Sequence, residues 1–228
     1  MPATGTLTMP ADVKERPILF SAPMVRAILA GTKTQTRRVV KTPKGIVSLY
    51  RPFPNDPQNV QGIDADGIIG WYAIPSVCPY GQPGDRLWVR ETFAKRLDCQ
   101  DGSDKAKHYV MYRADCAGES GPTDPMNWHD YGDGWTPSIF MPRWASRITL
   151  ELTAVRVERL QEIGEKDARA EGINDPLCVE VSTLATGCAT YSYAAAYRML
   201  WDKINGKRAP WDSNPWVWAI TFTRVENV

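Results

Sequence analysis

The sequence predicts an α+β fold: a small mixed β-barrel with flanking helices and two long loop excursions. Two observations support this prediction. Segments with strand patterns are spread along the whole chain and surround only a few helical segments. The regular strand–helix alternation of a doubly wound sheet is missing, so a small mixed barrel or another α+β arrangement fits better.

The N-terminal third contains a strand, a helix and a second strand. Residues 18–20 have the pattern of a short buried strand. Ser21 can cap the helix that follows, with Pro23 in its first turn, where a missing N–H costs little. Apolar residues recur at helical spacing up to Leu29, and Gly31 occupies the place of a left-handed C-terminal residue. Residues 32–40 are rich in Thr and Val and predict a strand.

Two strands are predicted in the middle of the chain. In residues 86–90, Leu87 and Val89 point to one face and Trp88 to the other. In residues 146–159 the apolar positions change parity part-way along. This change predicts a bulge near Thr153, as small barrels use at corners.

The C-terminal part is predicted to hold two helices and a closing strand. The short helix 165–171 has acids in its first turn and is followed by Gly172. The longer helix spans residues 191–204, and the strand spans 216–225. The apolar stripe of the longer helix consists of Tyr193, Tyr197, Leu200 and Ile204.

One domain is expected over residues 17–228, after a flexible N-terminal tail at residues 1–16. Insertions at about 42–84 and 98–143 are rich in Pro, Gly, Asp and Asn. Loops this long are uncommon unless they have a function or structure of their own.

Composition excludes several classes of protein. A net charge of +1 does not fit a protein that coats duplex DNA by bulk electrostatics. No apolar run approaches the roughly 20 residues of a membrane-spanning helix, and no secretory signal is present, so we expect a cytoplasmic protein. Five cysteines without CxxC spacing and two histidines predict reduced thiols rather than a metal site.

Residues 31–38 are predicted to be the centre of the functional site, and a nucleobase, nucleoside or RNA is the expected ligand. Thr and Gln side chains alternate there with Lys33, Arg37 and Arg38 where a helix gives way to a strand, so the segment can hold a phosphate or an anionic intermediate. The alternative is a solvated basic strand at a sheet edge. In an ideal strand Lys33 and Thr36 lie on opposite faces, so they converge only if the chain turns between them.

Arginines flank two tryptophans that are candidates for base stacking. Trp144 lies between Arg143 and Arg147, and Trp88 lies between Arg86 and Arg90. For most tryptophans of the chain, packing remains the alternative interpretation.

Two acids flank the predicted strand 86–90. We interpret Asp85 as a turn residue and Glu91 as a surface acid, rather than as a catalytic pair.

The pattern Gly31-x-Lys33-x-x-Thr36-x-Arg38, directly after a short helix, resembles the GxKxxTxR signature of ASCH domains, relatives of the PUA fold. Residues 84–90, 165–172 and 216–222 also resemble segments of that family, in the same order. Together with residues 141–147 they are similar to the larger ASCH proteins of phages and prophages. The resemblance covers about residues 17–225.

The resemblance implies a PUA-like β-barrel with a cleft for RNA or modified bases. One small bacterial branch of the family hydrolyses N4-acetylcytidine with a Lys, a Thr and a Glu, which match Lys33, Thr36 and Glu171 by position. Lys33 would accept the proton of the Thr36 nucleophile and Glu171 would protonate the leaving nitrogen, without metal or cofactor. Alternatively, Glu171 ends an exposed helix or pairs with Arg169 or Lys166.

The residues expected to bind ligand are Gly31, Arg37, Arg38, Arg86, Trp88, Arg90, Arg143 and Trp144.

Three functions are therefore weighed for this site. The first is hydrolysis of an N4-acylated cytosine nucleoside by Lys33, Thr36 and Glu171. The second is non-catalytic binding of single-stranded RNA or a modified base by a protein of phage or prophage origin. The third is a ribonuclease, ranked lowest because the sequence shows no histidine pair or carboxylate cluster. Convergence of the three side chains in one open cleft favours the enzyme, and a solvent-facing Glu171 favours binding.

Overall fold

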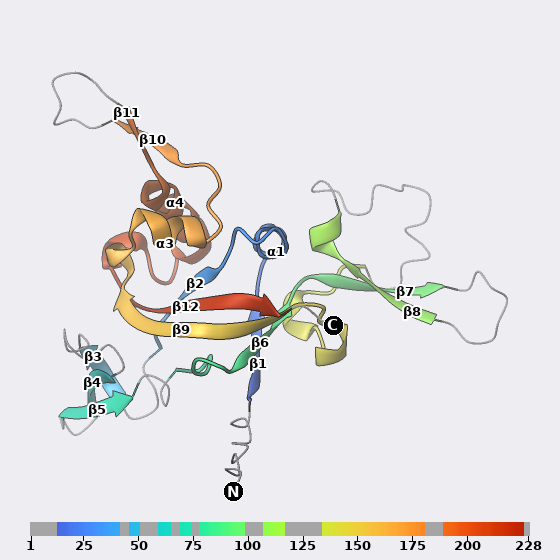
Figure 1. Cartoon of the computed structure of the whole chain (residues 1–228), viewed down its shortest axis with the longest axis horizontal. Coiled ribbons are helices and arrows are strands. Elements are labelled where there is room, and N and C mark those ends of the chain that lie inside the picture. Colours follow the sequence, from blue (N-terminus) through green and yellow to red (C-terminus); the bar gives the residue numbers. More distant parts are fainter. Residues whose placement is uncertain are drawn as a thin grey trace, which may run out of the picture.

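A five-stranded mixed sheet forms the centre of the computed structural model, with the strand order β1-β6-β9-β12-β2 (Figure 1). Strands β1 and β6 run parallel, and the remaining neighbours are antiparallel. The strands of this sheet are β1 (Glu15–Leu19), β2 (Gln35–Val39), β6 (Arg86–Arg90), β9 (Thr149–Arg159) and β12 (Trp216–Val225). The structure describes residues 13–41, 46–50, 59–64, 69–73, 78–98, 107–116, 134–180 and 189–225.

In the described part of the chain, the α-helices around this sheet are α1 (Ala22–Leu29), α3 (Glu165–Ala170) and α4 (Tyr193–Asn205). Val25 of α1 belongs to a buried cluster that includes Ile220 of β12. Tyr197 of α4 belongs to a second cluster that includes Val217. Val217 and Ile220 have opposite parity on β12, so the two clusters lie on opposite faces of that strand.

The first helix agrees with most of the features predicted from the sequence. Pro23 lies in its first turn and Gly31 has a φ of 73°, so both local predictions are confirmed. Ser21 holds the predicted N-cap position, but its side chain makes no capping hydrogen bond. The next strand begins at Gln35 rather than at residue 32. The amides of Thr32 and Lys33 both donate to Ala27 O, which keeps this segment in a turn.

The predicted bulge in the long strand is confirmed. Thr221 of β12 pairs with Ala154, and the next residue, Phe222, pairs with Leu152. Thr153 is the extra residue on β9, which is where the parity of the apolar residues changes.

The two C-terminal helices also lie close to their predicted positions, with two differences. Helix α3 ends before Gly172, whose φ of 89° requires glycine. Helix α4 begins at Tyr193, because β11 (Ala189–Ser192) pairs with β10 (Leu177–Glu180) in a hairpin that the sequence did not predict. Trp201 is buried there, whereas Ile204 of the predicted apolar stripe is 53% exposed.

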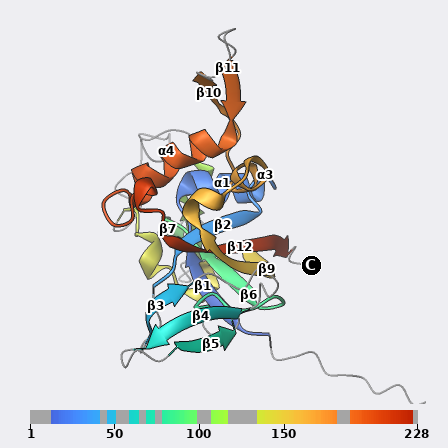
Figure 2. The ribbon, with the colours of Figure 1, turned by 90° about the vertical axis from the view of Figure 1, so that its left-hand side faces the viewer.

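The two predicted insertions contain small antiparallel sheets of their own. Strands β3 (Ile46–Tyr50), β4 (Asn59–Asp64) and β5 (Ile69–Ala73) lie in the first, and β7 (Phe93–Asp98) pairs with β8 (Lys107–Tyr112) around the start of the second. In both views the β10–β11 hairpin lies at the top and β3–β5 lie near the bottom (Figures 1 and 2). Short 3₁₀ helices among the described residues are Arg113–Asp115, Ser138–Phe140, Arg143–Ala145, Leu160–Glu162 and Trp211–Ser213.

The α+β class is confirmed, and the closed barrel stays a prediction. Among the described strands, β1 and β2 stand at the two ends of the central sheet and do not pair with each other. Strand β1 begins at Glu15, inside the tail predicted for residues 1–16, and residues 1–12 lie outside the described part of the chain. No helix in the described ranges has the length and apolar character needed to cross a membrane.

Replacing Gly172 with Ala should destabilise the protein. The new Cβ would lie 3.1 Å from the Cβ atoms of Ala27 and Lys33, at a positive φ that L residues avoid. We expect the free energy of unfolding to fall by about 1–3 kcal/mol in urea titrations. The matched control is Gly164→Ala at the other end of α3, where nothing lies within 4 Å of the new Cβ. Equal losses in the two variants would contradict the prediction.

Candidate functional site

A pocket of about 380 Å³ opens beside β2. The pocket is lined by residues 36–39, the end of α3 and the last turns of α4. Because residues 36–39 are consecutive, they include side chains from both faces of the strand. Because β2 is the last strand of the sheet and pairs with β12 on one side, the pocket runs along its other edge. Residues 36–38 of the predicted centre at residues 31–38 thus line this pocket.

Lys33 is buried at the turn between α1 and β2. Its backbone forms an isolated bridge with Glu171, and 2% of the residue is exposed. Its Nζ donates to Glu171 Oε2 at 2.7 Å and to the main-chain oxygen of Glu171 at 2.8 Å. The turn before Gln35 brings the Lys33 side chain to Glu171, which a straight strand from residue 32 would not do.

Burial lowers the pKa of Lys33, although the neighbouring Glu171 carboxylate opposes that shift. The positive charges of Arg38 and Arg37 act in the same direction as burial. The ring of Phe20 lies 5.8 Å from Nζ and contributes to the apolar surroundings. Lys33 is therefore easier to deprotonate than a surface lysine, as a proton acceptor requires.

Glu171 is buried, so the alternative of an exposed acid at a helix end is wrong. It is 5% exposed and pairs with Lys33 and Arg37 rather than with Arg169 or Lys166. Arg37 Nη1 lies 3.2 Å from Oε1. The Tyr197 hydroxyl donates to the same oxygen at 3.5 Å. Burial, together with the Glu171 charge, raises the pKa of Tyr197 well above its ordinary value, so the hydroxyl keeps its proton.

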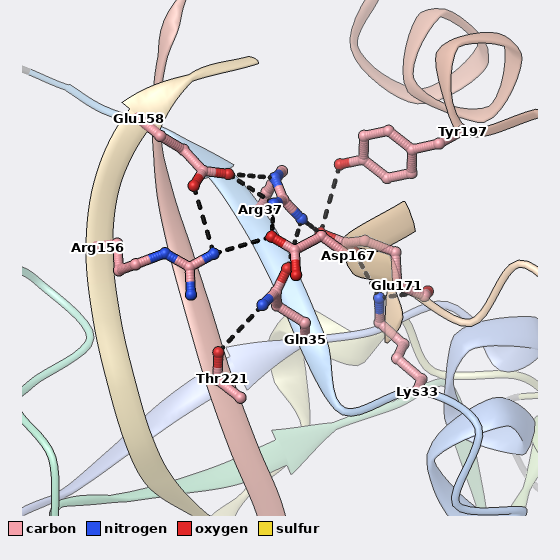
Figure 3. Close-up of polar contacts among 9 residues, drawn as sticks. All are labelled: Lys33, Gln35, Arg37, Arg156, Glu158, Asp167, Glu171, Tyr197 and Thr221. Carbon is pink, nitrogen blue, oxygen red and sulfur yellow. Dashed lines mark hydrogen bonds and ion pairs between the residues drawn. The ribbon is translucent and has the colours of Figure 1, made fainter. Parts of the chain in front are cut away.

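Arg37 connects Glu171 to acids on two other elements (Figure 3). Its Nε donates to Glu158 at 2.8 Å and its Nη2 to Asp167 at 3.0 Å. Burial disfavours the charge on Arg37, but Glu158 and Glu171 raise its pKa, so it stays cationic. These contacts occupy its donors, so Arg37 positions Glu171 rather than serving as a free cation.

The remaining members of this network were not predicted. Gln35 Oε1 accepts from Arg37 Nη1 at 2.7 Å. Arg156 donates to both Glu158 and Asp167. Arg37 and Arg156 lie on either side of Ala219 in the sheet. Only the strand register reveals this arrangement, because no local sequence pattern indicates it.

Thr36 and Arg38 point to the face of β2 opposite Arg37. Both line the pocket, and Thr36 is 3% exposed. The Arg38 guanidinium lies 5.2 Å from the centre of the Phe20 ring and donates to Leu19 O at 2.6 Å. Within the described residues no hydrogen bond joins the Thr36 hydroxyl to Lys33. The structure thus brings Lys33 to Glu171, and Glu171 and Thr36 to one pocket.

The other predicted ligand-binding residues do not line this pocket: Gly31, Arg86, Trp88, Arg90, Arg143 and Trp144. Gly31 is an exposed turn residue. Trp88 is 8% exposed, with the guanidinium carbons of Arg90 and Arg143 at 4.6 and 5.9 Å from its ring. Trp144 is 63% exposed, and Lys95 Nζ lies 5.8 Å from its ring. Trp88 is thus buried, and any stacking by Trp144 would take place on another surface.

The acids flanking β6 fall into two different environments. Asp85 accepts from the amides of Lys14 and Gln82, so its interpretation as a turn residue is confirmed. Glu91 is 2% exposed and binds Arg147 through both oxygens, so the interpretation as a surface acid is wrong. Burial raises the pKa of Glu91 despite Arg147. Among the described residues, no group of three or more His, Cys, Asp or Glu side chains is placed to hold a metal ion.

The fold and site together define an α+β protein with a buried lysine–glutamate pair beside a pocket at a sheet edge. Comparison with known protein families, curated proteins and solved structures found no match to this chain.

Lys33 should make the stability of the protein depend on pH. Its folded-state pKa is lowered from 10.5, so between the two values the unfolded chain binds more protons than the folded one. Its contribution to the free energy of unfolding must then rise with pH across that window. We expect the difference between wild type and Lys33→Met, measured by urea unfolding, to grow in favour of wild type toward pH 10. A difference independent of pH would contradict this prediction.

Proposed function

We propose that the pocket binds a cytosine nucleoside and that Lys33, Thr36 and Glu171 hydrolyse an N4-acyl amide on its base. The observation that carries the proposal is the buried contact of 2.7 Å between Lys33 Nζ and Glu171, next to a pocket lined by Glu171 and Thr36. The resemblance of residues 31–38 to the ASCH signature supports the same assignment and suggests a PUA-like barrel.

The dimensions and lining of the pocket suit a planar base. Its volume of about 380 Å³ falls in the range of roughly 300–1,000 Å³ typical of small-molecule sites. Tyr80, Tyr197 and Trp201 supply aromatic surface, and Met24 and Leu200 supply aliphatic surface. A nucleobase can pack against these groups while its exocyclic nitrogen faces Glu171 and Thr36.

The proposed reaction begins with a proton transfer inside the ion pair, from Lys33 to Glu171. Neutral Lys33 then accepts the hydroxyl proton as Thr36 Oγ attacks the acyl carbon. Glu171 gives its proton to N4 as the C–N bond breaks, which leaves cytidine and an acyl ester on Thr36. Water then attacks this ester and gives one proton to the Glu171 carboxylate, while Thr36 recovers its hydroxyl proton from Lys33 and the carboxylic acid leaves. Transfer of the proton from Glu171 back to Lys33 restores the ion pair.

Arg37 would hold Glu171 in place during this cycle. Its contacts to Glu158 and Asp167 fix the guanidinium, which in turn contacts Glu171 Oε1. The other carboxylate oxygen remains on Lys33, so each oxygen of Glu171 has one cationic neighbour.

Thr36→Ala should abolish hydrolysis, because it removes the nucleophile while keeping the pocket. We expect purified protein to release cytidine from N4-acetylcytidine and the variant to lose at least about 1,000-fold in kcat. Thr36→Ser should retain measurable activity because it keeps a hydroxyl. The control is Thr34→Ala at an exposed position two residues earlier, which should match wild type. Full activity in Thr36→Ala would rule out the mechanism.

A second candidate is a non-catalytic reader of single-stranded RNA or a modified base, as a phage or prophage protein. The observation that favours it is that both hydrogen bonds of Lys33 Nζ go to Glu171, which suits a structural ion pair. Trp144, exposed beside Lys95, then provides a surface on which a base can stack.

This non-catalytic RNA-binding function can be tested at Trp144. Trp144→Ala should weaken binding of a short single-stranded RNA by about 1–3 kcal/mol, since stacking on one aromatic side chain contributes that much. Fluorescence anisotropy measures the affinity, and raising the salt concentration should weaken it further. Tyr191→Ala, at an exposed aromatic residue of β11, is the control. Equal affinities for wild type and Trp144→Ala would contradict this role.

A further inference from the structure

The same pocket is lined by basic side chains that the hydrolysis mechanism does not use. Arg38 lies on β2, Lys41 lies just after the end of β2, and Arg208 lies just after α4. They come from segments far apart in sequence and border one cavity. Lys41 and Arg208 are exposed, so a ligand entering the pocket can reach them.

These cations have no acidic counterpart in the pocket. Of the described residues that line it, Glu171 is the only acid, and its oxygens are bound by Lys33 and Arg37. Within the described part of the chain, Lys41 and Arg208 form no ion pair or side-chain hydrogen bond. Arg37, by contrast, has acidic partners on β9 and α3. The pocket therefore carries uncompensated positive charge.

Arg38 provides a second, independent observation. Its Nη2 donates to Leu19 O, but its Nε is buried without a hydrogen-bond partner in the structure. Leaving a buried charged donor unsatisfied is unfavourable, so an acceptor placed at Arg38 Nε would be stabilising. An anion in the pocket is the kind of group that could accept from it.

We propose that Arg38, Lys41 and Arg208 form a phosphate subsite, and that the natural ligand is a cytosine nucleotide rather than a free nucleoside. Arginine forks match the geometry of phosphate oxygens, and a lysine adds a point charge. The phosphate belongs either to a mononucleotide or to a single strand. This inference rests on the proposed function for the base-binding half of the pocket and extends it to the substrate class.

The test compares binding of cytidine, cytidine 5′-monophosphate and a short oligocytidylate by isothermal titration calorimetry. We expect wild type to bind the monophosphate at least about 10-fold more tightly than cytidine at low salt, as charge-assisted contacts to a phosphate allow. The Lys41→Ala/Arg208→Ala double variant should lose this preference while its affinity for cytidine stays within about 2-fold. An oligocytidylate that matches the monophosphate supports a strand as the source, and one that binds more weakly supports the free nucleotide.

The matched control is Lys203→Ala/Lys207→Ala, which removes two exposed cations near the same end of α4 that do not line the pocket. This control should keep the preference for the monophosphate. Equal affinities of wild type for cytidine and its monophosphate would overturn the phosphate subsite but leave the nucleoside function standing. Retention of the preference in the Lys41/Arg208 double variant would also overturn it. Absence of binding by all three ligands would overturn both proposals.

Discussion

The contact between Lys33 and Glu171 is the constraint on which the site depends. An amine buried to this extent needs an acceptor, because its charge has lost its hydration. Glu171 supplies both a carboxylate oxygen and its main-chain oxygen, and the two residues also form a backbone bridge. The bridge ties the turn after α1 to the end of α3. The position of β2, and hence the edge along which the pocket opens, follows from this connection.

Arg37 extends that constraint across the sheet. It joins Glu171 to Glu158 of β9 and Asp167 of α3, so one guanidinium connects the edge strand to two other elements. Buried ion pairs of this kind contribute little net stability, since desolvation offsets their attraction. In this site the ion pairs fix the position of the Glu171 carboxylate. Each oxygen of Glu171 faces a fixed cation, and the carboxylate has little freedom to turn away from the pocket.

The pocket divides by the chemistry of its walls. Tyr197, Trp201 and Leu200 give α4 an aromatic and aliphatic wall, whereas Arg38, Lys41 and Arg208 give basic groups. The overall charge of +1 shows that this basic character is local. With that composition, the proposed nucleotide would be attracted by a few placed groups rather than by a general positive field.

The sequence by itself determined several local features, although not the β10–β11 hairpin. The parity change in residues 146–159 predicted the bulge at Thr153, and Gly31 and Gly172 marked two helix ends. Residues 31–38 stood out as a basic, hydroxyl-rich junction. These features follow from backbone propensities and side-chain periodicity, which act over a few residues.

Only the tertiary structure decided which of these residues meet. Glu158, Asp167 and Tyr197 reach the site from elements more than a hundred residues after Lys33, through strand register and helix packing. The parallel pairing of β1 with β6 and the burial of Glu91 were likewise invisible in the local patterns. Periodicity reports which face of an element a residue occupies. It does not report which other element lies against that face, and for Lys33, Thr36 and Glu171 that arrangement determines the chemistry.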